Sequence, residues 1–245
     1  PRDFAPEVLA EAADVQDLQP VGRVDLTDVP FVTVDPPGSM DLDQAMHLAR
    51  TPFGYRVRYA IADVGALVRP GGALDAAAHE RVVTMYCPDE RVPLHPTSLS
   101  EDAGSLLPEV DRLAVVWDLA LDREGELRDV VVRRAVVRSR ARLDYPGLQR
   151  RLDDGGDPDD LPRLLAEVGT ARAALERTRG GVSLARPEQE VVEAPGGGWR
   201  LEYRAPLAVE EHNEQVSLLT GMAAARLMLD AGVGVLRTLP PARAD

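Results

Sequence analysis

The chain has 245 residues, of which 44% are hydrophobic, so it can bury a globular core in one large domain or two small ones. A formal net charge of −13 argues against bulk electrostatic attraction to nucleic acid but leaves room for a local basic groove. Cys87 is the only cysteine, which excludes an internal disulfide and favours the reducing cytoplasm. We find no signal peptide and no apolar run long enough to span a membrane, so we expect a cytoplasmic protein without membrane contact.

The first half of the chain is predicted to be rich in strands, because short apolar or alternating segments are bounded by glycine, proline and aspartate. Residues 1–28 are expected to form a lead-in with one short helix at about residues 6–15. Alternating polar and apolar residues on both sides of the turn at 51–54 predict a hairpin. Strands are predicted at residues 31–34, 45–49, 55–61, 113–121 and 127–137, and a helix is predicted at residues 74–83.

The second half mixes helices with one hairpin. Asp144 precedes Tyr145-Pro146, and proline suits the first turn of a helix. Helices are therefore predicted from residue 144, at residues 161–178 and from about Leu207 to Asp230, with a hairpin whose turn lies at residues 195–198. Strands that come first and helices that come later indicate an α+β fold rather than regular alternation.

The segment from Val34 to Ala45 is the strongest candidate for a functional site. It holds Asp35, Asp41 and Asp43 within nine residues, on a backbone that Pro-Pro-Gly makes irregular. Carboxylates gathered this closely repel one another unless a positive charge lies between them, and oxygen ligands suit a hard cation such as Mg²⁺ or Mn²⁺. An ordinary surface turn has a similar composition, so that reading stays open on the loop alone.

Further motifs follow this loop in a fixed order. They are Tyr59-Ala60-Ile61-Ala62-Asp63-Val64, Leu74-Asp75, Met85-Tyr86-Cys87-Pro88, Val92-Pro93-Leu94-His95-Pro96, Gly104-Ser105-Leu106, Gly180-Gly181-Val182 and Glu214 to Arg226. Together with the aspartate loop, this colinear set resembles the RNB catalytic domain of the ribonuclease II type exoribonucleases. The resemblance covers roughly residues 30 to 240.

The resemblance implies an α+β fold of the RNB type, with antiparallel sheets and flanking helices, over residues 29–245. It implies a metal-dependent exoribonuclease that cuts single-stranded RNA from the 3′ end into nucleoside 5′-monophosphates, with Mg²⁺ or Mn²⁺ as cofactor. Asp35, Asp41 and Asp43 would be catalytic metal ligands, and Gln44 would be a neutral fourth catalytic residue. Tyr86 would stack on the terminal nucleotide, and Glu214 would face the substrate.

Two departures from the family pattern keep alternatives open. Gln44 stands where the family usually has aspartate, and the family's later Thr-x-Pro motif with its phosphate-binding arginines has no counterpart, so the C-terminal part of the domain is expected to be missing. A second hypothesis is therefore an inactive or weak RNB-fold protein that binds RNA and regulates. A third, resting on the carboxylates alone, is a metal-dependent hydrolase of small phosphates. Tyr86 could instead be a core residue and Glu214 a solvated helix residue.

One cluster of basic residues leaves two readings open. The residues are Arg133, Arg134, Arg138, Arg140 and Arg142. They could line a groove that grips phosphate, or they could form a solvated strand face.

Overall fold

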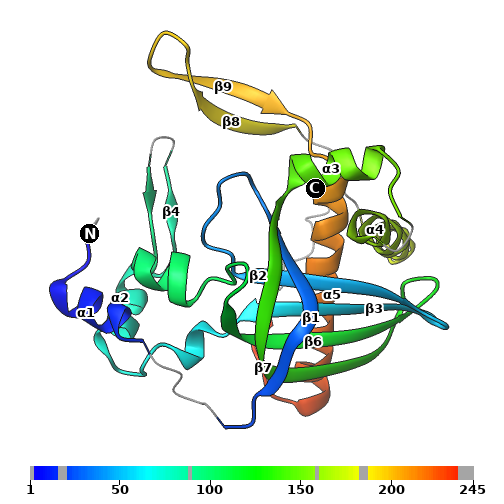
Figure 1. The fold of residues 1–245 in the computed structure, drawn as a ribbon, viewed down its shortest axis with the longest axis horizontal. Coiled ribbons are helices and arrows are strands. Elements are labelled where there is room, and N and C mark those ends of the chain that lie inside the picture. The colour runs from blue at the N-terminus through cyan, green and yellow to red at the C-terminus, as the bar shows by residue number, and fades with distance from the viewer. Residues whose placement is uncertain (1–2, 16–20, 88–89, 158–159, 182–186, 237–245) are drawn as a thin grey trace, which may run out of the picture.

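The computed structural model describes residues 3–15, 21–87, 90–157, 160–181 and 187–236 (Figure 1). Its centre is a closed barrel of five strands, which follow one another around the barrel in the order β1-β2-β3-β6-β7. The strands are β1 (Val24–Asp35), β2 (Gln44–Thr51), β3 (Gly54–Ala62), β6 (Asp111–Asp122) and β7 (Leu127–Asp144). The predicted α+β class with antiparallel sheets and flanking helices is confirmed.

The barrel closes through a parallel pairing between β1 and β7, whereas its other neighbouring strands are antiparallel. The register of β1 against β7 shifts between Leu26 and Phe31, where Pro30 has no N–H to donate to the ladder. Beyond this irregularity the pairing continues to Asp35, which lies opposite Asp144. The last residue of β1 is thereby placed beside the residue that precedes helix α3 (Tyr145–Asp153).

Three helices cover part of the barrel. Helices α3, α4 (Leu161–Thr178) and α5 (Ala208–Ala231) share an apolar cluster with the strands. Side chains alternate along each strand, so Met46 and Tyr59 contribute to this cluster, whereas their neighbours Ala45 and Ala60 belong to a second cluster of strand and loop residues. The long helix α5 passes behind the barrel in Figure 1. Its position matters because the predicted substrate-facing Glu214 lies on it.

The N-terminal residues pack on a separate part of the domain. Helix α1 (Pro6–Ala13) lies against α2 (Ala73–Arg81) and shares a third apolar cluster with it, to which the single turn η1 (Val64–Ala66) and η2 (Leu99–Ala103) also contribute. Glu11 on α1 accepts hydrogen bonds from the backbone N–H groups of Ala73 and Leu74, at 2.6 and 3.2 Å. A residue distant in sequence therefore caps α2, where Gly72 offers no side chain of its own.

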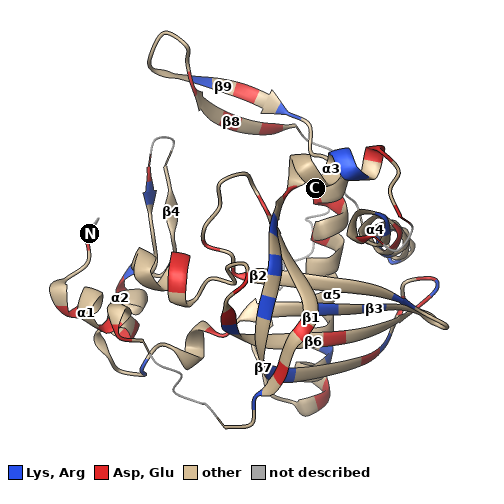
Figure 2. Ribbon diagram, in the orientation of Figure 1, with Lys and Arg blue, Asp and Glu red and all other residues tan. Residues whose placement is uncertain are grey.

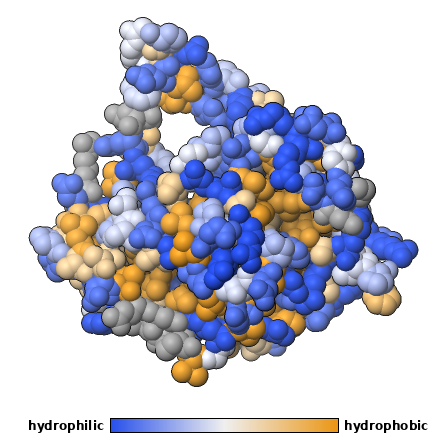
Figure 3. All heavy atoms as spheres, in the orientation of Figure 1, coloured by the Kyte–Doolittle hydropathy of each residue, from blue (hydrophilic) through white to orange (hydrophobic). Residues whose placement is uncertain are grey.

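Two hairpins project from this body (Figure 1). One joins β4 (Met85–Tyr86) to β5 (Arg91–Val92), and the other joins β8 (Glu188–Glu193) to β9 (Trp199–Arg204). Hydrophobic atoms are visible on the second hairpin at the top of Figure 3. Leu201 on β9 is 62% exposed. Among the residues that the structure describes, no helix is long and apolar enough to cross a membrane.

The predicted helices and hairpins are confirmed, although β7 continues to Asp144, beyond the predicted strand end at residue 137. The parallel closure and the β4–β5 pairing were not predicted. Strand β1 already begins at Val24, within the expected lead-in, and the division of the chain at residue 28 stays a prediction. Pro88 and Val182, which belong to two of the family-like motifs, lie outside the described residues.

The contact between α4 and α5 predicts a clear effect for a single methyl group. A Cβ added to Gly169 on α4 would lie 2.6 Å from Cβ and 2.7 Å from Cα of His212 on α5. Gly169→Ala should therefore push the helices apart and lower the free energy of unfolding by about 1–3 kcal/mol. Gly221→Ala on α5 is the control, since its Cβ meets no atom within 4 Å and should leave stability equal or higher. Urea unfolding midpoints of the two variants measure the difference, and equal midpoints would contradict it.

Candidate functional site

The aspartate loop connects the end of β1 to the start of β2. Gly38, with φ of +85°, allows the turn after Pro36-Pro37, and the backbone N–H of Ser39 donates to the carbonyl of Pro36 at 3.2 Å. Leu42 is fully buried and anchors the middle of the loop. Figure 2 shows acidic residues on this loop and basic residues along β7.

A buried serine fixes the loop backbone. Ser105 Oγ accepts from the N–H of Leu42 at 3.0 Å and donates to the carbonyl of Met40 at 2.7 Å, while Leu106 N–H donates to the carbonyl of Leu42 at 2.8 Å. Ser105 and Leu106 belong to the Gly104-Ser105-Leu106 motif, which lies more than sixty residues after the loop in the sequence. The role of this motif in the fold is to hold the backbone of the aspartate loop. Asp41 and Asp43 are the two neighbours of Leu42, so these hydrogen bonds also fix the backbone from which their carboxylates extend.

The carboxylates of the loop lie close enough to perturb one another. Burial, with the added repulsion of Asp43 and Asp41, raises the pKa of Asp35 to about 6. Burial and the charge of Asp41 also raise the pKa of Asp43, although a hydrogen bond from the Gln44 side chain opposes the shift. Asp35 Oδ2 is buried and has no hydrogen-bond partner among the described residues.

Asp41 has a different partner. Its Oδ2 accepts a hydrogen bond from Arg91 Nη1 at 2.7 Å, and Arg91 Nη2 also donates to Glu101. Within the described ranges, no three Asp, Glu, His or Cys side chains converge as a group able to hold a metal ion. The three expected ligands are close enough to influence one another's charge. However, the side chain of Asp41 is held by the guanidinium of Arg91 and does not converge with Asp35 and Asp43 on a common metal position.

Gln44 is engaged on both sides of its amide. Its Oε1 accepts a short hydrogen bond from the hydroxyl of Tyr59, and its side chain also hydrogen-bonds to Asp43. Burial raises the pKa of Tyr59 to about 12, so this hydroxyl keeps its proton and remains a donor. The amide therefore bridges Tyr59 and Asp43 and has one acceptor lone pair left for any other contact.

A cavity of about 260 Å³ gathers residues from four parts of the chain. Asp35 and Gln44 come from the loop ends, Tyr145 comes from α3, and Glu214 comes from α5. The other lining residues are Val34, Met46, Tyr59, Glu210, Asn213 and Ser217. The structure therefore brings Glu214 to Asp35 and Gln44, which are far from it in sequence, whereas Asp41 and Asp43 are not among the lining residues.

The wall of this cavity includes residues that sequence reasoning missed. Asn213 Nδ2 donates to the hydroxyl of Tyr145 at 3.0 Å, which ties α5 to α3 beside Asp35. Tyr145 followed the predicted helix start, and Asn213 stood next to Glu214, but neither carried a signal of its own. A larger groove of about 980 Å³ shares Tyr145, Glu210 and Glu214 with the cavity and extends to the base of the β8–β9 hairpin at Glu188 and Arg204.

Tyr86 lies outside both hollows. It is on β4, 75% exposed, and pairs across the hairpin with Arg91. The alternative that Tyr86 is a core residue is therefore wrong.

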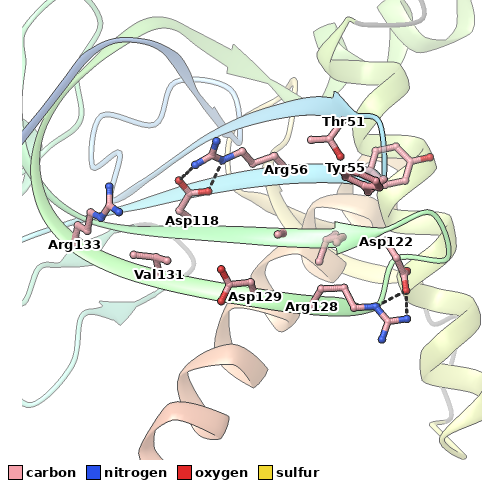
Figure 4. Close-up of a pocket in the computed structure, with 12 residues that line it drawn as sticks. Thr51, Tyr55, Arg56, Asp118, Asp122, Arg128, Asp129, Val131 and Arg133 are labelled. Carbon is pink, nitrogen blue, oxygen red and sulfur yellow. Dashed lines mark hydrogen bonds and ion pairs between the residues drawn. The ribbon is translucent and has the colours of Figure 1, made fainter.

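The arginines of β7 are mostly engaged in local contacts. Arg138 donates to Asp111 at 2.7 Å, and Arg142 donates to the carbonyl of Ser39 at 3.1 Å, which ties β7 to the aspartate loop. Arg133 instead lines a hollow of about 560 Å³ over β3, β6 and β7 (Figure 4). None of the predicted site residues lines this hollow, and its Arg56 and Arg128 are paired with Asp118 and Asp122.

The residues at the loop fit a divalent cation in their chemistry. They supply carboxylate oxygens, one of which is buried without a hydrogen-bond partner in the described part of the chain, and burial together with repulsion between the carboxylates raises the pKa of Asp35. Asp35, Asp41 and Asp43 would have to converge to hold such an ion together, and Asp41 would first have to leave Arg91.

Comparisons with known proteins identify relatives of this chain in sequence and in fold. Residues 23–241 match the model of the RNB domain. The chain is 31% identical over 239 residues to ribonuclease R of Escherichia coli, covering 93% of this chain and 29% of that protein. It superimposes on Mycoplasma genitalium RNase R, solved with ribose-methylated single-stranded RNA, with a TM-score of 0.87 at 24% identity, covering 95% of this chain and 38% of that one. It also superimposes on yeast Ssd1, described as a pseudonuclease, with a TM-score of 0.67 at 16% identity, covering 86% and 26%.

The raised pKa of Asp35 predicts that this carboxylate destabilises the metal-free fold. Its pKa lies near 3.8 when unfolded and about 6 when folded, so stability is lost as pH rises through this window and stays lower above it. Asp35→Asn should raise the free energy of unfolding by about 1–2 kcal/mol at pH 7.5 in chelator, and by little at pH 4.

The matched control is Asp118→Asn on the barrel wall. Although burial opposes it, the hydrogen bond and charge of Arg56 lower the pKa of Asp118, so its loss should reduce stability at pH 7.5. Denaturant titrations at the two pH values test both variants. A destabilised Asp35→Asn protein at pH 7.5 would contradict the prediction.

Proposed function

The chain belongs to the RNB family, and from this premise we propose that it carries the catalytic centre of an exoribonuclease acting on single-stranded RNA. The proposed reaction is metal-dependent hydrolysis from the 3′ end, which releases nucleoside 5′-monophosphates. The observation that carries the proposal is the meeting of Asp35 and Gln44, from the two ends of the aspartate loop, with Glu214 around one cavity, which shares part of its wall with a larger groove. The chain spans 29% of the length of the E. coli relative, so the proposal concerns the whole protein that contains it.

The proposed cofactor is Mg²⁺ or Mn²⁺, held by Asp35, Asp41 and Asp43. When bound, a divalent cation lowers the pKa of the attacking water and stabilises negative charge on the attacking and leaving oxygens. Water oxygen forms a bond to phosphorus while the bond from phosphorus to the 3′ oxygen of the upstream nucleotide breaks. The phosphate stays on the released nucleotide, and the upstream RNA gains a 3′ hydroxyl.

The chain's own residues would position these groups. Gln44 holds Asp43 through one side of its amide while Tyr59 holds the other, so the proposed role of Gln44 is to orient a ligand. Glu214 lines the same cavity as Asp35 and can accept a hydrogen bond from a ribose hydroxyl. The tie between Asn213 and Tyr145 keeps the wall of the cavity in place.

The remaining features of the proposal concern the substrate and the location. The proposed substrate is single-stranded RNA, for which the groove beside the cavity offers an extended surface and the exposed Tyr86 offers a ring on which a base can stack. A cytoplasmic location is consistent with the exposed thiol of Cys87, the single cysteine, since a reducing compartment keeps it free.

A specific observation also favours the second candidate, an RNB-fold protein that binds RNA without cleaving it. The amide at Gln44 adds no negative charge, and the fold is shared with a pseudonuclease. This candidate predicts RNA binding but no nucleotide release at any Mg²⁺ or Mn²⁺ concentration.

The deciding experiment measures nucleotide release by the full-length natural protein from a labelled RNA with a 3′ single-stranded tail. We expect release that requires Mg²⁺ or Mn²⁺ and falls at least about 100-fold in Asp43→Asn. Removing a residue that only hydrogen-bonds to a metal ligand typically costs about 10- to 100-fold in activity, and removing the ligand itself should cost more. Asp129→Asn, which removes the same charge at the distant outer hollow, is the control and should keep full activity.

Three results separate the candidates. Unchanged release by Asp43→Asn contradicts the proposed site. Binding without release by the wild-type protein supports the second candidate. Equal rates on a dinucleotide and on tailed RNA would indicate a hydrolase of small phosphates, because an enzyme with an extended groove should prefer the longer substrate.

A further inference from the structure

The β4–β5 hairpin carries an arginine in an unusual position. Arg91 lies directly opposite Tyr86 in the antiparallel pair, so the two side chains share one face of the hairpin. From this face Arg91 reaches the aspartate loop, where Nη1 contacts Asp41 at 2.7 Å, while Nη2 contacts Glu101 on η2. An exposed aromatic ring, a guanidinium and a carboxylate of the candidate centre are therefore contiguous.

The guanidinium is only partly withdrawn from solvent. The side chains of Arg91 and Asp41 are 31% and 37% exposed, so their ion pair stabilises the fold by at most about 1 kcal/mol and can be exchanged for another partner. The planar fork that now joins Asp41 and Glu101 matches the geometry of a phosphate group equally well. A cation that draws Asp41 away would leave this fork available.

We propose that Arg91 is a phosphate-binding residue of the site, held by Asp41 and Glu101 until the RNA backbone replaces them. Tyr86 stacks on a base and Arg91 contacts the phosphate beside it, so one face of the hairpin grips both parts of a nucleotide. Glu101 is then a competitor for the guanidinium, and its negative charge weakens RNA binding. This inference rests on the proposed function, since it concerns the same substrate.

The test measures binding of a fluorescent single-stranded RNA by anisotropy at several salt concentrations. The full-length protein carries Asp43→Asn in every arm, which prevents hydrolysis. Adding Arg91→Gln should weaken binding about 5- to 10-fold and reduce the slope of log K against log salt by about 0.7, the value for one phosphate contact on a single strand. Arg91→Lys keeps the charge, so it should retain the slope and lose less affinity.

Two matched controls separate phosphate binding from general effects. Arg128→Gln removes a 68% exposed arginine, paired with Asp122, on the outer barrel face and should change neither affinity nor slope. Glu101→Gln should tighten RNA binding a few-fold by releasing Arg91. Asp102→Asn removes the same charge at the neighbouring residue. Because Asp102 pairs with Arg112 and not with Arg91, this variant should tighten RNA binding less than Glu101→Gln does.

The outcomes are distinct. Unchanged affinity and slope in Arg91→Gln would overturn the inference while leaving the proposed nuclease intact. Weaker binding in both Arg91→Gln and Glu101→Gln, with an unaltered slope and lowered thermal midpoints, would show that Arg91 only supports the hairpin and would also overturn it. If the parent protein binds no RNA at all, both the inference and the proposed function fail.

Discussion

The parallel pairing of β1 with β7 is the constraint on which the candidate site depends. It closes the barrel and carries Asp35 to the same rim as Asp144. The side chain of Asp144 then caps α3 by accepting from the N–H of Gly147 at 2.6 Å, so α3 begins at this rim with Tyr145 as its first residue. Without this closure, Asp35 and Tyr145 would have no common cavity, and α5 would have no fixed wall against which to present Glu214.

Charge is arranged around the site at a cost to the fold. Burial and mutual repulsion hold the pKa of Asp35 well above its ordinary range, while Arg91 pairs with Asp41 and shares its charge with Glu101. A chain selected only for stability would not keep, beside two more carboxylates, a buried carboxylate oxygen that has no hydrogen-bond partner within the described ranges. The arrangement is typical of a centre that binds positive charge, and it explains why an overall net charge of −13 says little about how the protein treats RNA.

The departure at Gln44 has a structural consequence that its chemistry alone did not indicate. An amide oxygen is a possible neutral ligand, but here it accepts from Tyr59, and the side chain also bonds to Asp43. Met46 and Tyr59 are register partners between β2 and β3, which brings the Tyr59 hydroxyl toward the start of β2. An amide can donate and accept at once, whereas a carboxylate at this position would only accept.

The amino-acid sequence by itself determined the order of the helices and of the β2–β3, β6–β7 and β8–β9 hairpins, the aspartate loop and the family, because periodicity, turn residues and motif order are local properties of the chain. Asp35, Asp43, Gln44 and Glu214 could be named as candidates for this reason. Only the tertiary structure decided that β1 pairs in parallel with β7, that Glu214 meets Asp35, and that Arg91 holds Asp41. These contacts join residues separated by tens to more than a hundred positions, and their formation depends on closure and packing of the whole barrel, which no local pattern records.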